Sequence, residues 1–146
     1  MRVIVMRGLL ILVLVGLFAS PAGATQKQNE ANFFADKNQV NLLIGKTLEL
    51  GQMEGVIGLT DFAVEAYNKA VNGNTSAAHA TIFAKMSWYS LSWAMILLSH
   101  DKLASQEQFS DIGEKLSTVG ELFGWSEAQT MEMFKQTRVR FNEYIK

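Results

Sequence analysis

Apolar residues recur at helical spacing through most of the chain, and no segment alternates apolar and polar residues over the length of a strand. A first region of this kind runs from about Asn32 to Val71 and stops at an Asn-Gly-Asn turn, residues 72–74. Such a region would make an unusually long helix, so we expect a break within it. The best position for this break is near Gly51, which would leave two helices of roughly 18 to 20 residues each.

The next region begins at residues 74–76, Asn-Thr-Ser, where any residue can cap a helix, and it continues to about His100. Between residues 82 and 98 it carries a single charge, on Lys85, and apolar side chains occur on all sides. A helix of this kind is either central in a bundle or embedded in a membrane. The charge of Lys85 and the serines of the segment favour the central position.

The last two helices each begin with a Ser-x-x-Gln capping box, at Ser105 to Gln108 and at Ser126 to Gln129. Gly124 ends the first of them. The expected core face of the first helix consists of Phe109, Ile112, Leu116, Val119 and Phe123. That of the second consists of Met131, Phe134, Phe141 and Ile145, and Arg138 interrupts it, with a stem that can pack along the core while its head reaches solvent. Because the linkers are short, neighbouring helices should be antiparallel. The sequence therefore predicts an all-α fold, a four- to five-helix antiparallel bundle.

Residues 1–24 have the order of a secretory signal peptide. Two arginines precede ten largely apolar residues, 9–18, and small residues follow that suit cleavage between Ala24 and Thr25. The apolar run is shorter than the ~20 residues that span a bilayer. The sequence therefore predicts a cleaved signal peptide and a single helical-bundle domain over residues 25–146, which is periplasmic or secreted.

The net charge excludes nucleic acid as a partner, and the lack of cysteine bears on how the protein is stabilised. The whole chain has a formal charge of −1, and removal of the two signal-peptide arginines leaves 11 basic and 14 acidic residues, a charge of −3. A mildly acidic chain without a basic patch does not bind nucleic acid by neutralising phosphates. The chain has no cysteine, so its stability after export must come from packing rather than from disulfide bonds.

The sequence GQMEGVIG, residues 51–58, places three glycines on one side of a helix. Glycine inside a helix lowers the stability of that helix, so three glycines on one side need a structural reason. We expect a second helix, residues 77–88, to pack closely against this strip, which consists of Gly51, Gly55 and Gly58. Glu54 should then point away from the strip. A hinge at Gly51 and the approach of a ligand are the alternatives, and no glycine pattern of a phosphate loop occurs.

The segment GQMEGVIGLTDFA, residues 51–63, resembles a helical segment of secreted immunity proteins that neutralise cell-wall amidases. The resemblance covers about a tenth of the chain, and the cysteines expected of that group are absent. We therefore transfer no residue role from it.

Glu54, Asp61 and Glu65 have spacings that place them along one face of a continuous helix. A solvated face is the ordinary explanation of such carboxylates, and an acidic surface for a basic partner is the alternative. Tyr89 and Trp93 lie either in the core or in an exposed aromatic patch that marks a binding surface. These five side chains are the candidate partner-binding residues.

No group of residues points to catalysis, to a metal or to a cofactor. His79 and His100 are 21 residues apart in the chain, about 30 Å along one helix, so they do not share a metal ion. Met131 and Met133 point about 200° apart on a helix, so they do not converge on one. No motif places a serine or cysteine nucleophile. We therefore expect no enzyme activity, no catalytic residue, no metal and no cofactor.

The sequence thus favours a small exported helical protein that binds a protein partner, as an inhibitor, immunity factor, chaperone or accessory subunit. The partner is not identified, and a homo-oligomer is one option. The second hypothesis is a carrier of a small ligand or lipid, with an apolar pocket between helices. The third is a membrane-associated subunit with residues 82–98 embedded.

Overall fold

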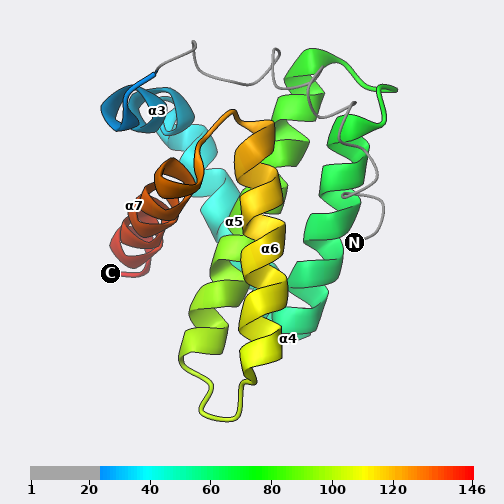
Figure 1. Cartoon of the computed structure of the whole chain (residues 1–146), viewed down its shortest axis with the longest axis vertical. Helices are drawn as coiled ribbons and strands as arrows, with labels where there is room; N and C mark the ends of the chain where they lie inside the picture. The colour runs from blue at the N-terminus through cyan, green and yellow to red at the C-terminus, as the bar shows by residue number, and fades with distance from the viewer. Residues whose placement is uncertain (1–23) are drawn as a thin grey trace.

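The computed structural model describes residues 24–146, so all but the last residue of the expected signal peptide lies outside the described part. The described part contains five α-helices and no strand (Figure 1). They are α3 (Gln26–Phe33), α4 (Lys37–Val71), α5 (Ala77–Ser99), α6 (Gln106–Leu122) and α7 (Glu127–Ile145). The predicted all-α bundle is confirmed.

Side-chain caps explain where the helices begin. Both predicted capping boxes form, at α6 and at α7: the Ser hydroxyl accepts the backbone N–H of the Gln, and the Gln side chain accepts the backbone N–H of the Ser. Ser76 caps α5 by accepting the backbone N–H of His79. Thr25 and Gln28 form a third capping box at the start of α3, a helix that the apolar pattern does not predict.

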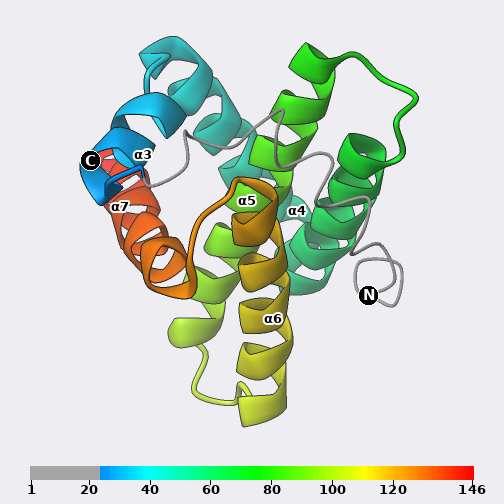
Figure 2. The ribbon, with the colours of Figure 1, turned by 45° about the horizontal axis from the view of Figure 1, so that its top comes forward.

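The long helix α4 is broken at Gly55, where φ is 67° and ψ is −164°. This conformation is essentially restricted to glycine. The two halves of α4, cyan before the break and teal to green after it, diverge in both ribbon views (Figures 1 and 2). The predicted break near Gly51 is confirmed, but it falls four residues later, at Gly55; Gly51 itself is helical and buried.

The break also removes most of the predicted glycine strip. Only Gly51 meets another helix, since a Cβ there would lie 2.8 Å from the ring of Trp93 in α5. Nothing lies within 4 Å of a Cβ at Gly55, and a Cβ at Gly58 would meet the side chain of Glu54. The prediction that Glu54 points away from the glycines is wrong, because this side chain lies against Gly58 across the break.

Helix α5 lies at the centre of the bundle, as its apolar surface predicts, with α4, α6 and α7 packed against it. Trp88 in the middle of α5 is fully buried, and its indole N–H donates to Thr137 Oγ1 of α7 at 2.9 Å. The Thr137 hydroxyl donates in turn to the Met133 carbonyl at 2.8 Å. Among residues 24–146, no helix is both long and apolar enough to cross a membrane.

Helix α7 buries a different face from the one predicted. Its buried residues are Thr130, Met133, Thr137 and Phe141. Both threonine hydroxyls donate to a carbonyl one turn earlier in α7, so these side chains are buried without an unpaired polar group. Met131 is 68% exposed, and Arg138 and Ile145 are exposed too. The prediction that Met131 and Ile145 lie on the core face is wrong; Arg138, expected to interrupt that face with its head in solvent, is exposed.

Replacing Gly55 by alanine should lower the free energy of unfolding by about 1 to 3 kcal/mol, because a residue with a Cβ is strained in this conformation. Gly113→Ala is the matched control, since Gly113 lies inside α6 and the nearest atom to a Cβ there is 4.0 Å away. The control should raise the free energy of unfolding by about 0.5 to 1 kcal/mol. Urea unfolding followed by circular dichroism measures both, and a Gly55→Ala variant as stable as the native chain would contradict the assigned break.

Candidate functional site

The two aromatic candidates belong to the interior. Tyr89 is fully buried, and its ring centre lies 5.7 Å from that of Phe33 and 6.2 Å from that of Phe141. Trp93 is half-buried and stacks on Phe141 with ring centres 4.9 Å apart. Of the two alternatives for Tyr89, the core position is therefore confirmed and the exposed patch is not, and Trp93 joins α5 to α7.

The three acidic candidates are all exposed on α4. Because α4 breaks at Gly55, the spacing that would align Glu54 with Asp61 and Glu65 on a continuous helix does not apply. Glu65 Oε1 lies 3.3 Å from Lys69 Nζ, so its charge is partly compensated. Their binding of a basic partner stays a prediction.

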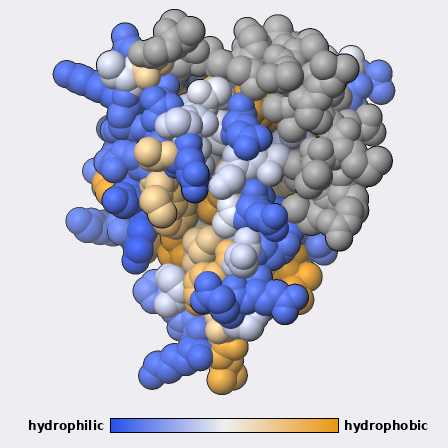
Figure 3. Space-filling model, in the orientation of Figure 1, coloured by the Kyte–Doolittle hydropathy of each residue, from blue (hydrophilic) through white to orange (hydrophobic). Residues whose placement is uncertain are grey.

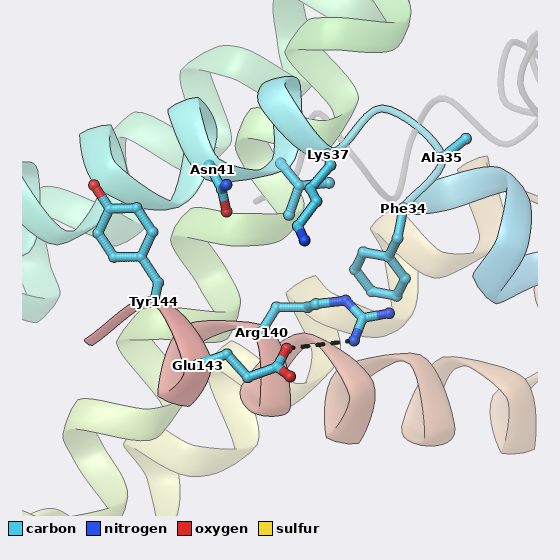
Figure 4. Close-up of a pocket in the computed structure, with 8 residues that line it drawn as sticks. Phe34, Ala35, Lys37, Asn41, Arg140, Glu143 and Tyr144 are labelled. Atoms are coloured by element: carbon cyan, nitrogen blue, oxygen red, sulfur yellow. Dashed lines mark ion pairs between the residues drawn. The ribbon is translucent and has the colours of Figure 1, made fainter. Parts of the chain in front are cut away.

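A pocket of about 680 Å³ lies where the start of α4 meets the end of α7, and Figure 4 shows its lining side chains. Arg140 crosses this pocket, with its guanidinium 4.5 Å from the ring centre of Phe34 and Nη1 3.6 Å from Glu143 Oε1. The Tyr144 hydroxyl lies against the backbone of Gly45 in α4. Since the charge of Arg140 is already paired and stacked, these contacts are best explained as the attachment of α7 to α3 and α4.

A second pocket, of about 720 Å³, is here called the α6–α7 groove. Its apolar lining consists of Met95, Leu116, Met131 and Phe134, and its acidic lining consists of Glu114, Glu121 and Glu127. The three glutamates are exposed. In the described part of the chain, the four ion pairs all involve other carboxylates. The groove therefore combines an apolar floor with negative charge that no basic side chain neutralises.

The turn between α6 and α7 sets the shape of this groove. A Cβ at Gly120 would collide with the side chain of Thr130, so the start of α7 approaches α6 this closely only because residue 120 is glycine. The backbone N–H of Trp125 donates to the Gly120 carbonyl at 3.0 Å and closes the turn. Beyond this contact the two helices diverge (Figure 1). Over this region, hydrophobic side chains are visible between hydrophilic ones in Figure 3.

A third pocket, of about 480 Å³, is here called the Ser90 pocket and lies between α4 and α5. It is lined by Leu43, Lys46, Thr47, Glu49, Leu50, Met53, Phe62, Met86 and Ser90. None of these residues lines the α6–α7 groove. The bundle thus presents two separate pockets with largely apolar linings.

Two tyrosine hydroxyls and one lysine lie in unusual surroundings. Tyr67 and Tyr89 are fully buried, and neither hydroxyl has a hydrogen-bond partner in the described structure. Burial raises the pKa of both hydroxyls above the ordinary value of 10.0; the charge of Glu121 raises that of Tyr67 further. Burial lowers the pKa of the partly buried Lys85, whose Nζ donates to Gln39 Oε1 at 3.0 Å and so ties α5 to α4.

Among residues 24–146, no three His, Cys, Asp or Glu side chains are grouped so that they could hold a metal ion. Comparisons of the chain with protein-family models, with curated proteins and with solved structures found no match. The function must therefore be argued from the two apolar pockets themselves.

Tyr67→Phe and Tyr89→Phe should each raise the free energy of unfolding at pH 7 by about 1 to 2 kcal/mol, because each removes a buried hydroxyl without a partner. Both should also reduce the loss of stability in alkali. Above pH 10.0 the unfolded chain releases the tyrosine protons while the folded chain keeps them, so stability falls as pH rises. Urea unfolding at several pH values measures both effects. Tyr144→Phe, at an exposed position, is the control. If Tyr67→Phe or Tyr89→Phe instead lowered the free energy of unfolding, the hydroxyl removed would be one that forms a hydrogen bond in the folded protein.

Proposed function

We propose that this chain is an exported protein that acts by binding a basic, amphipathic segment of another protein in the α6–α7 groove. The observation that carries the proposal is the set of three glutamates, free of ion pairs in the described structure, beside an apolar floor. An inhibitor, immunity factor, chaperone or accessory subunit would each use such a surface.

The chemistry of the groove selects its partner. Apolar side chains one helical turn apart on the partner would be buried against Leu116 and Phe134, which is how amphipathic helices occupy grooves. Met131 is exposed and flexible, so it can adapt to the shape of the incoming side chains. Lysine or arginine residues beside those anchors would pair with the glutamates, and this complementarity speeds association and excludes acidic partners.

The groove is also supported by a rigid framework. Trp125, in the turn that joins α6 to α7, is buried and stacks on Phe123 with ring centres 4.9 Å apart. Its ring also meets that of Trp88 in α5 at 5.1 Å. A groove held in this way needs little ordering when a partner binds, which favours affinity.

The start of the fold is consistent with the proposed export. Thr25 caps α3, and the helix itself begins at Gln26. Cleavage after Ala24 would therefore leave all five described helices intact. Within residues 24–146, cleavage would remove the hydrogen bond that Gln129 Nε2 donates to the Ala24 carbonyl at 3.0 Å.

Expression of the whole chain in a Gram-negative bacterium should release a protein that begins at Thr25 into the periplasmic fraction, because residues 1–24 have the order of a signal peptide. Intact-mass spectrometry of the fraction released by osmotic shock measures the N-terminus. A chain of full mass that stays with the membranes would contradict export while leaving the groove untested, so binding is measured separately.

A synthetic amphipathic helix with leucines on one face and lysines beside them should bind the exported protein, and the affinity should fall as salt rises. Fluorescence anisotropy of the labelled peptide measures binding. The double variant Glu121→Gln and Glu127→Gln should weaken binding by roughly five- to tenfold, because two rim charges are lost. Gly113→Leu should block the groove, since Gly113 lines it and a Cβ there comes no closer than 4.0 Å to another side chain, the end of Met95.

Two controls make the outcome specific. Glu107→Gln removes an exposed glutamate of α6 that does not line the groove, and it should leave the affinity unchanged. The second control is the same peptide with glutamate in place of lysine, which should not bind. Equal binding of both peptides, or an equal effect of Glu107→Gln, would show that the groove does not select a basic segment.

A further inference from the structure

One residue that lines the Ser90 pocket, Ser90 itself, carries a buried hydroxyl that the described part of the chain leaves unbonded. The side chain of Ser90 is only 1% exposed, and its hydroxyl has no hydrogen-bond partner in the described structure. Thr47 also lines the pocket, but its hydroxyl donates to the Leu43 carbonyl at 2.7 Å. A buried hydroxyl without a partner costs stability. A bound molecule that supplies a hydrogen bond would recover this cost.

The break in α4 creates this pocket. Met53 and Phe62 are nine residues apart, so on a continuous helix they would point in nearly opposite directions. Both nevertheless line the same pocket, opposite Met86 of α5, because the chain changes direction at Gly55 between them. A glycine-only backbone conformation thus gives α4 an apolar concave side.

We infer that the Ser90 pocket binds a small, uncharged, largely apolar molecule that carries one hydrogen-bonding group, such as an alcohol with an alkyl chain. Its polar group bonds to Ser90 Oγ, and its apolar part lies against Leu50, Phe62 and Met86. The volume of about 480 Å³ lies in the usual range of small-molecule sites. The two methionines can adapt to ligands of different shape.

The charges around the pocket exclude an ionised ligand head. Lys46 and Glu49, the charged residues of the lining, are exposed and opposite in sign. Neither offers a buried counter-charge beside Ser90. A carboxylate placed at Ser90 would lose its hydration without compensation, whereas a hydroxyl, ester or amide would lose much less. The pocket should therefore prefer an alcohol to the carboxylate of the same chain length.

The methyl groups of the five methionines in residues 25–146 provide a direct readout. With methyl-labelled methionine in the exported protein, titration with 1-octanol should give saturable NMR shifts at Met53 and Met86, which line the pocket, and none at Met131. Octanoate should bind at least roughly tenfold more weakly. Ser90→Ala should weaken 1-octanol binding by about three- to tenfold, because one hydrogen bond is lost.

Ser92→Ala is the matched control. Ser92 is also fully buried with an unpartnered hydroxyl, but it does not line the pocket. This variant should leave the affinity for 1-octanol unchanged. The absence of saturable shifts at Met53 and Met86, equal affinities for octanol and octanoate, or equal effects of the two serine variants would each overturn the inference. The octanol and octanoate titrations of the native protein decide the question even if a variant does not fold.

Discussion

Trp88 donates its indole N–H to Thr137 inside the core, and the arrangement of three other elements depends on this contact. The Trp88 ring meets Phe33, the last residue of α3, at 6.4 Å between ring centres, and Trp125, in the turn before α7, at 5.1 Å. The indole thus joins α5 to α3, to the α6–α7 turn and to α7. Loss of the acceptor would leave a buried donor unpaired, which costs much more than the bond itself contributes. A polar contact within an aromatic cluster thus helps to fix the position of α7, together with the stacking of Trp93 on Phe141.

Both apolar pockets arise where backbone geometry, rather than the hydrophobic pattern, decides the structure. The α6–α7 groove opens because α7 approaches α6 closely at Gly120 and then follows its contacts with Trp88. The Ser90 pocket opens because α4 breaks at Gly55. In each case a single glycine brings two helical segments together at one point, and the diverging segments leave an apolar surface between them.

Local interactions explain which parts of the fold could be predicted from the sequence. A capping box involves four consecutive residues, so Ser105 and Ser126 mark helix starts correctly. The break in α4 could not be placed, because the choice between Gly51 and Gly55 depends on Trp93, which packs beside Gly51 and holds it helical and buried. The buried face of α7 was also missed. The hydroxyls of Thr130 and Thr137 donate to backbone carbonyls one turn earlier in the chain. These polar residues can therefore be buried in the core without an unpaired hydroxyl.

The spacing of charged residues in the sequence indicates in part where the α6–α7 groove lies. All four ion pairs in the described chain join residues three or four apart on one helix. Glu114, Glu121 and Glu127 have no basic residue at those spacings, so their lack of a partner can be read from the sequence. The same is true of Glu54 and Asp61. What distinguishes the two sets is the size of the adjoining pocket: about 720 Å³ beside the first, where α6 and α7 diverge over Met95 of α5, and about 190 Å³ beside Asp61. Unpaired charge therefore identifies candidate surfaces, and tertiary packing selects among them the one that can also bury apolar side chains of a partner.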